Sequence, residues 1–149
     1  MTKLNAAMTG VTKLGFDTAP LIYFVERNPK YVDLVREVVR RVDSGQITGF
    51  SSMIALTEVL TKPKKVGDTE TESEYRDLLL HSRSFKLIAI DSAVAERAAD
   101  LRARFNLRTP DALQISAALE TGCQAFLTND IKLKRVTDLR VLILDELEL

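Results

Sequence analysis

The sequence has little cysteine and histidine, the side chains that most often serve as soft metal ligands, nucleophiles and general bases. It contains one of each among 149 residues, Cys123 and His81. One cysteine cannot form a disulfide within the chain, and one histidine cannot build a site from clustered histidines. No nucleophile-elbow sequence is present, which disfavours Ser-His-Asp or Cys-His catalysis. We interpret Cys123 as a small core residue and His81 as a surface residue.

Long apolar runs and an excess of one charge are also missing. No stretch approaches the roughly 18 apolar residues of a membrane span, and residues 1–9 show no signal-peptide pattern. Basic and acidic residues number 21 each, so the net charge is zero and provides no general attraction to nucleic acid. Glycine-rich nucleotide-binding motifs are absent as well. We expect a soluble cytoplasmic protein without a membrane partner, which would hold any RNA through local basic patches or a metal ion.

The sequence does contain an alternation of short apolar strands and helices. Its 149 residues, 46% hydrophobic and 28% charged, suit a single globular domain over residues 1–149. The hydrophobic pattern predicts strands at 11–17, 47–51, 85–90, 124–128 and 141–144. It predicts helices at 18–26, 30–43, 52–62, 70–83, 92–105 and 109–121.

This alternation favours an α/β fold whose parallel sheet is covered by helices on both faces. Thr18, Ser52 and Asp91 are predicted to cap helices, and Pro63 is predicted to end one. Each of the first three connections between strands holds two helices, whereas a right-handed crossover needs only one. We expect the surplus helices to lie across or above an edge of the sheet, where they would wall a cleft.

Four acidic residues stand where such a sheet would gather them. Asp17 and Asp130 follow the first and fourth predicted strands, so both belong at the carboxyl edge, where open α/β sheets bind ligands. Glu58 lies within the helix after the second strand, and Asp111 lies in the first turn of a later helix. Taken singly, each acid has an ordinary use as a cap, turn or surface residue.

Four carboxylates at one place would repel one another and destabilise the fold unless a cation neutralised them. A site of oxygen ligands suits Mg²⁺ or Mn²⁺. These ions hold phosphate oxygens and lower the pKa of bound water, so that hydroxide is available near neutral pH. The residues by themselves therefore predict an acidic metal site at a sheet edge that could hydrolyse phosphodiesters without histidine.

From about Gly15 to Leu147 the sequence resembles PIN-domain ribonucleases, most closely the VapC-type toxins of prokaryotic toxin–antitoxin pairs. The resemblance is carried by four segments: Asp17-Thr18 followed by Leu21-Ile22-Tyr23, Glu58 in a helix after Ser51-Ser52, Thr109-Pro110-Asp111-Ala112 with Gln114, and Leu127-Thr128-Asn129-Asp130. It implies a PIN-like three-layer α/β/α sandwich with a parallel sheet of five strands, ordered third, second, first, fourth, fifth. The chain departs from the family in a longer stretch before the first strand and in that strand's weaker apolar character.

The resemblance also implies Mg²⁺- or Mn²⁺-dependent endonucleolytic cleavage of RNA, with 5′-phosphate and 3′-hydroxyl products. Three acids would bind metal directly and a fourth would bind a second metal or lie one shell out: Asp17, Glu58 and Asp111, then Asp130. Four polar neighbours would orient these ligands or the attacking water, unless some of them only cap helices: Thr18, Ser52, Thr128 and Asn129.

Basic residues close to these acids in the sequence are candidate RNA contacts, although an ordinary solvated surface would explain them too. They are Lys62, Lys64, Lys65 and Arg108, with Arg102 and Arg104 beside the last. The resemblance implies a small antitoxin protein as a partner, and we expect a homodimer. Apolar helix faces are candidate contacts, with core packing as the alternative: Leu21 and Phe24, or Val35, Val38 and Val39.

Three other functions compete with this one. A catalytically silent PIN-like module that binds nucleic acid or protein is disfavoured by the complete set of four acids. A receiver-like signalling domain would need adjacent acids after the first strand, whereas Asp17 stands alone in Phe16-Asp17-Thr18. A DNA-directed nuclease of the same fold is the third alternative.

Overall fold

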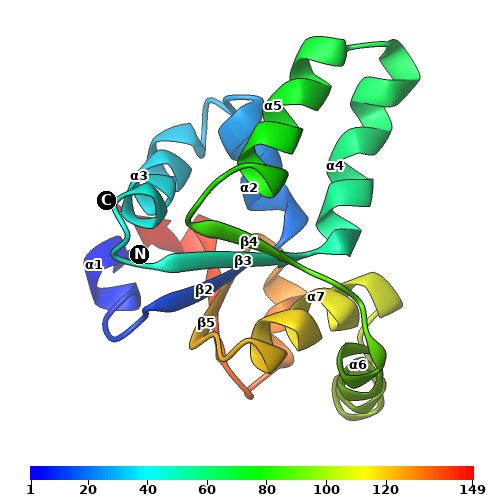
Figure 1. Ribbon diagram of the computed structural model, residues 1–149. Helices are drawn as coiled ribbons and strands as arrows, with labels where there is room; N and C mark the ends of the chain where they lie inside the picture. The colour runs from blue at the N-terminus through cyan, green and yellow to red at the C-terminus, as the bar shows by residue number, and fades with distance from the viewer.

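The computed structural model describes residues 1–149 and has a central sheet with helices on both faces (Figure 1). Its strands are β1 (Thr2–Lys3), β2 (Lys13–Phe16), β3 (Thr48–Ser52), β4 (Phe85–Ile88), β5 (Ala125–Thr128), β6 (Arg140–Ile143) and β7 (Leu147–Glu148). Its α-helices are α1 (Leu4–Ala7), α2 (Thr18–Val25), α3 (Val32–Asp43), α4 (Met53–Val66), α5 (Thr69–Leu80), α6 (Ser92–Phe105) and α7 (Thr109–Glu120). Two 3₁₀ helices follow β5 and β6: η1 (Ile131–Arg135) and η2 (Leu144–Glu146).

The main sheet has five parallel strands in the order β4-β3-β2-β5-β6. This arrangement confirms the parallel α/β fold and the strand order that the family resemblance implied. A small second sheet, in which β1 pairs in parallel with β7, was not predicted. It brings the two ends of the chain side by side, with Thr2 opposite Leu147 (Figure 1).

Successive strand residues supply two separate hydrophobic cores. Ala125 and Leu127 of β5 join the core beneath α2, α3 and α5, whereas Phe126, which lies between them, joins the core beneath α6 and α7. Strand side chains alternate between the faces, so central strands covered on both sides must be apolar throughout. Gly15 accounts for the weaker apolar character of the first strand, because a Cβ there would lie 2.7 Å from the Ala118 Cβ. The glycine lets α7 pack closely on the sheet.

Two predicted helix ends are wrong. Pro63 does not stop its helix: α4 continues to Val66 and ends at Gly67, whose left-handed φ of 72° suits glycine. A proline removes one hydrogen bond within a helix, and here its ring is buried, which compensates part of that loss. Thr18 is not a cap, since the Asp17 carboxylate accepts the Thr18 N–H and caps α2 instead. The caps predicted at Ser52 and Asp91 are confirmed.

The two rare side chains lie where the sequence suggested. Cys123 is buried in the core beneath α6 and α7, and burial raises the pKa of its thiol to about 11. His81 is exposed at the end of α5, with Nδ1 3.1 Å from the Asp77 Oδ1. None of the helices combines the length and the apolar character that crossing a membrane would require.

Candidate active site at the carboxyl edge of the sheet

The four acids belong to elements that meet at one edge of the sheet. Asp17 and Asp130 follow the neighbouring strands β2 and β5. Glu58 lies on α4, which rises directly from the end of β3, and Asp111 lies in the first turn of α7. In Figure 1 the arrow of β3 points to the side where α4 begins and where the yellow start of α7 lies. The parallel topology therefore brings all four to the carboxyl edge.

Asp17 is the innermost of the four. Its Oδ1 accepts the Thr18 N–H at 2.8 Å, and its Oδ2 accepts the Thr128 hydroxyl at 2.7 Å. Burial raises the pKa of this carboxyl above 3.8, and the charges of Asp111 and Glu58 raise it further, against the lowering effect of the two hydrogen bonds. The acids thus share one electrostatic environment, which is the condition that a bound cation relieves.

A buried chain of neutral polar groups fixes Glu58 from below. The Thr18 hydroxyl donates to Glu58 Oε1 at 2.9 Å and accepts from Gln114 Nε2 at 3.0 Å. Gln114 Oε1 in turn accepts the Ser52 hydroxyl at 2.5 Å. Every buried side-chain nitrogen and oxygen in the structure has a hydrogen-bond partner. The predicted helpers Thr18 and Ser52 are therefore linked through Gln114, a residue whose role the sequence did not reveal.

The sequence gives only a weak indication that Gln114 has a role in the site. It lies one helical turn after Asp111, among the apolar residues of α7, and its side chain is only 2% exposed. An amide buried at that depth must find partners within the protein. Its partners lie 62 and 96 residues away, on Ser52 and Thr18. No local pattern indicates such distant contacts.

Thr128 joins Asp17 to Asp130. Its hydroxyl donates to Asp17 and accepts the Asp130 N–H at 3.1 Å. The Asp130 Oδ1 accepts the Lys132 N–H at 3.0 Å and so caps η1. Asn129 contacts other residues: its Oδ1 accepts the Asp145 N–H at 2.9 Å, and its Nδ2 donates to the Tyr23 hydroxyl at 3.4 Å. It holds the loop in place and forms no hydrogen bond with Asp130.

Asp111 is paired with a basic residue of its own helix start. Arg108 Nε lies 3.0 Å from Asp111 Oδ2, and the two side chains are 78% and 13% exposed, respectively. The guanidinium therefore stands at the mouth of the site, while the carboxylate lies within it. Arg108 is the one predicted RNA contact that the structure brings into contact with a predicted metal ligand.

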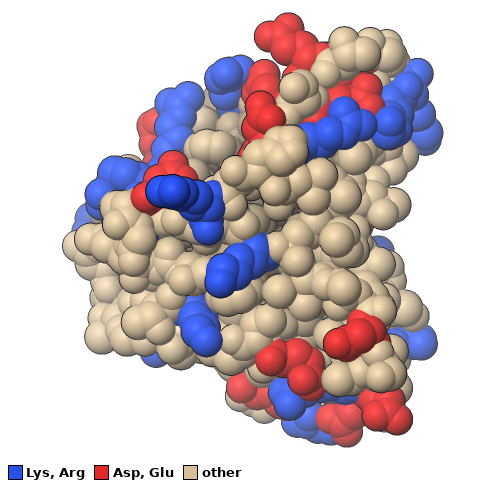
Figure 2. Space-filling model, in the orientation of Figure 1, with Lys and Arg blue, Asp and Glu red and all other residues tan.

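Of the other basic residues predicted to contact RNA, some are paired within the protein and some are not. Lys64 is committed to Glu72 at 2.8 Å, whereas Lys62 and Lys65 form no salt bridge. Figure 2 shows basic side chains gathered over the end of α4 that is remote from the sheet. Arg104 pairs with Asp138 at 2.6 Å, and Arg102 Nε donates to the Leu107 carbonyl at 3.1 Å. These two arginines therefore stabilise the protein's own structure.

The donor set fits a hard divalent cation, although it does not form a closed cage. Its candidate ligands are carboxylate oxygens, which suit Mg²⁺ or Mn²⁺ better than zinc. No three His, Cys, Asp or Glu side chains converge closely enough to make a complete metal site. Three of the carboxylates are instead held by donors of the protein: the Thr18 hydroxyl, the Arg108 guanidinium and the Lys132 N–H. Each of these hydrogen bonds occupies one oxygen of its carboxylate, and only the Arg108 guanidinium carries a positive charge that would compete with a cation.

Comparisons with known proteins give one family match and several similar structures. A model of the PIN domain family matches residues 16–139. Comparison with curated proteins gives no match. Among solved structures, a chain of VapBC2 from Rickettsia felis, bound to a DNA fragment from its promoter, is 18% identical with a TM-score of 0.70 and covers 88% of this chain and 98% of its own.

Two further structures are similar. A chain of a toxin–antitoxin complex from Klebsiella pneumoniae is 24% identical with a TM-score of 0.65, covering 89% of this chain and 97% of its own. A chain of DNA-bound VapBC from Salmonella typhimurium is 16% identical with a TM-score of 0.69, covering 97% and 99%. At these identities the structural matches establish the fold.

Proposed function

The chain belongs to the PIN domain family, and from that premise we propose that it is a metal-dependent endoribonuclease that acts as the toxin of a toxin–antitoxin pair. The observation that carries the proposal is the meeting of Asp17, Glu58, Asp111 and Asp130 at the carboxyl edge of one parallel sheet. A structural role alone would not require four acids at one place, since their mutual repulsion costs stability.

The proposed roles follow from the contacts of each acid. Asp17, Glu58 and Asp111 would hold Mg²⁺ or Mn²⁺, with Asp130 binding a second ion or lying one shell out. The ion would supply a Lewis acid for the phosphate and lower the pKa of water. Thr18 would orient Glu58 through its 2.9 Å hydrogen bond, and Thr128 would orient Asp17 through its 2.7 Å hydrogen bond.

Cleavage of RNA by the wild type and by Asp111→Asn, each in Mn²⁺, Mg²⁺ and EDTA, tests the proposal. The exchange keeps the size of the side chain and removes its charge. We expect the wild type to cleave RNA only when the metal ion is present. Cleavage by Asp111→Asn should be weaker by more than roughly 10–100-fold, which is the usual loss when a hydrogen-bond partner of a metal ligand is removed. Asp33→Asn is the matched control, because that carboxylate lies on α3 and is 83% exposed.

The same assay separates the competing functions. Equal activity in EDTA, or in a folded Asp111→Asn protein, would contradict the metal mechanism. RNA binding without cleavage would favour a silent binding module. A DNA oligonucleotide of the same length, run in parallel, distinguishes an RNA-directed nuclease from a DNA-directed one.

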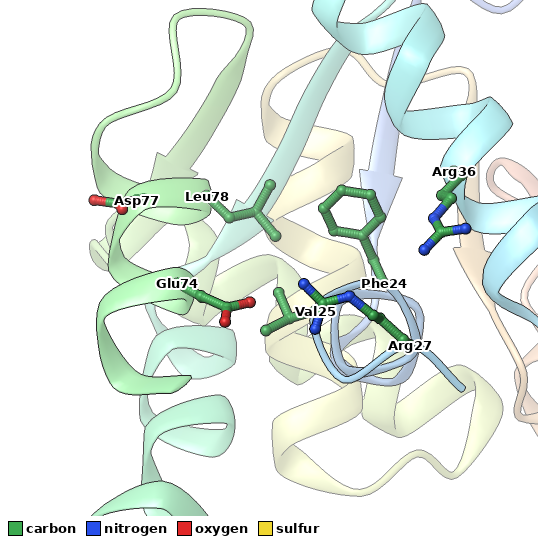
Figure 3. A pocket seen from close by; sticks show the side chains of 7 residues that line it. All are labelled: Phe24, Val25, Arg27, Arg36, Glu74, Asp77 and Leu78. Atoms are coloured by element: carbon green, nitrogen blue, oxygen red, sulfur yellow. The ribbon is translucent and has the colours of Figure 1, made fainter. Parts of the chain in front are cut away.

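The proposed antitoxin partner has a candidate surface away from the carboxylates. A hollow of about 410 Å³ lies between α2, α3 and α5. In Figure 3 Phe24, Val25 and Leu78 face one another, with Arg27 and Arg36 on one side and Glu74 on the other. The other apolar residues that the sequence suggested for this purpose are buried in the core: Leu21, Val35, Val38 and Val39.

The toxin proposal predicts growth arrest when the chain is expressed, relieved by a small protein encoded next to it. If that protein fills the hollow, Leu78→Glu should arrest growth as the wild type does but escape relief. Relief of both proteins to the same degree would place the contact elsewhere. A homodimer, expected from the sequence, remains a prediction that sedimentation velocity can check.

A further inference from the structure

We propose that Arg108, Lys132 and Arg135 form a subsite for a phosphate of single-stranded RNA that flanks the cleavage point, and that Arg108 is shared between this phosphate and Asp111. The inference rests on the proposed ribonuclease function and adds a substrate contact to it. In the sequence alone, Lys132 and Arg135 belong to an ordinary basic stretch after Asp130.

The subsite is a cleft that opens onto the candidate active site. The cleft has a volume of about 440 Å³ and lies between the start of α7 and η1. Two of the proposed metal ligands, Asp111 and Asp130, form part of its wall, together with all three basic residues. A phosphate bound in the cleft would therefore lie next to a phosphate of the same RNA strand bound at the carboxylates.

Two of the cations in the cleft have no carboxylate partner. Neither Lys132 nor Arg135 forms a salt bridge, whereas Lys134, in the same short helix, pairs with Glu146 at 2.5 Å. Arg135 is nevertheless held in place, since its Nε donates to the Lys132 carbonyl at 2.9 Å and its Nη1 to the Phe105 carbonyl at 3.0 Å. Neutral carbonyls position a guanidinium without cancelling its charge. A positioned cation of this kind suits a phosphate.

Arg108 connects the cleft to the metal site. Its Nε lies 3.0 Å from Asp111 Oδ2, on a side chain that is 78% exposed. A divalent cation on Asp111 would remove the charge that holds the guanidinium, which would then be available to RNA. A phosphate that draws Arg108 away would likewise free Asp111 for the cation. Binding of RNA and binding of metal should therefore favour one another, because such coupling is reciprocal.

Fluorescence anisotropy of a labelled single-stranded RNA, in EDTA so that metal-dependent cleavage is prevented, tests the phosphate subsite. The double variant Lys132→Ala/Arg135→Ala should bind roughly 10-fold more weakly or worse, the usual scale for removing hydrogen bonds to charged groups. The log–log slope of its affinity against salt concentration should become shallower by about 0.7 for each phosphate that the variant no longer neutralises.

Arg83→Ala/Lys86→Ala is the matched control, since it also removes one arginine and one lysine that are exposed and form no salt bridge. Arg83 lies just before β4 and Lys86 lies within it. β4 is the edge strand of the sheet farthest from β5 and β6, near which η1 lies. The control should bind RNA as the wild type does. Equal weakening of both double variants would show a general charge effect and overturn the subsite.

A single variant tests the subsite without the risk that a lost internal contact unfolds the protein. The Lys132 side chain donates no hydrogen bond within the protein, so Lys132→Gln removes a charge from the cleft without removing an internal contact and without adding a carboxylate beside Asp111 and Asp130. We expect weaker RNA binding with an unchanged melting temperature. Wild-type affinity in this variant would contradict the proposal.

Titration calorimetry of Mn²⁺ binding, without RNA, tests the sharing of Arg108. Arg108→Ala should bind Mn²⁺ several-fold more tightly than the wild type, because Asp111 no longer has its competing partner. Lys132→Ala, which removes a nearby charge that is not bonded to Asp111, should show a smaller gain. An unchanged Mn²⁺ affinity in Arg108→Ala would overturn the sharing.

These outcomes separate the two proposals. If the wild type cleaves RNA and the cleft variants bind it normally, the subsite is wrong and the ribonuclease function stands. If the wild type neither binds nor cleaves RNA, both fail together.

Discussion

The candidate site has a floor and a rim that are built from different chemistry. The floor consists of Ser52, Gln114, Thr18 and Thr128, which are neutral and no more than 8% exposed. The rim consists of Glu58, Asp111 and Asp130, which are charged and more exposed, and each is held by a single side-chain or backbone donor of the protein. Asp17 lies between the two layers and is the acid whose pKa burial raises.

The difference follows from the cost of burial. A neutral polar group can be buried once its hydrogen bonds are made, whereas an ionised carboxylate also loses its hydration. The floor can therefore orient the ligands rigidly, and the rim can carry charge that rearranges around a cation. Three predictions test this division, beginning with the largest expected effect.

Gln114→Met should break the floor. Methionine fills a similar volume but cannot accept from Ser52 or donate to Thr18, so a buried hydroxyl loses its partner. An unsatisfied buried group costs about 1–3 kcal/mol, and we expect a loss of that order in the free energy of unfolding measured in urea. Gln46→Met is the control, because Gln46 is exposed and should leave stability unchanged. Equal stability of the two variants would show that the floor contributes nothing.

Thr18→Val should disconnect the floor from the rim. It removes the hydroxyl that donates to Glu58, and we expect Mn²⁺ affinity to fall by about 10–100-fold, as for other partners of metal ligands. Thr18→Ser keeps the hydroxyl and should bind Mn²⁺ nearly as the wild type does. Loss of affinity in both variants would point to packing of the threonine methyl group instead.

Asp17→Asn should raise stability in EDTA at pH 7. Because the pKa of Asp17 is raised above 3.8 in the folded protein, its ionised form costs stability at neutral pH. The cost decreases as the pH falls through the folded pKa and disappears below 3.8, where the carboxyl is protonated in both the folded and the unfolded state. We expect a higher Tm than that of the wild type at pH 7 and no difference in Tm near pH 3. A lower Tm at pH 7 would contradict the raised pKa.

The sequence indicated those parts of the site whose position follows from knowing which segments are strands and which are helices. Asp17 and Asp130 could be assigned to one edge because parallel strands place their carboxyl ends together. The caps at Ser52 and Asp91 follow from local hydrogen bonds of the backbone, which adjacent residues decide. Thr18 shows the limit of that reasoning: its position suited a cap, but Asp17 caps the helix and the hydroxyl turns to Glu58.

The sequence by itself thus determined the order of strands and helices, the carboxyl edge and the four acids, because hydrophobic period and turn residues act over short stretches. The tertiary structure alone decided the link from Ser52 through Gln114 to Thr18, the cleft that joins Arg108 to Lys132 and Arg135, and the pairing of β1 with β7. Each of these joins segments far apart in the chain. Such contacts form only where the packing of the whole sheet and its helices brings the segments together.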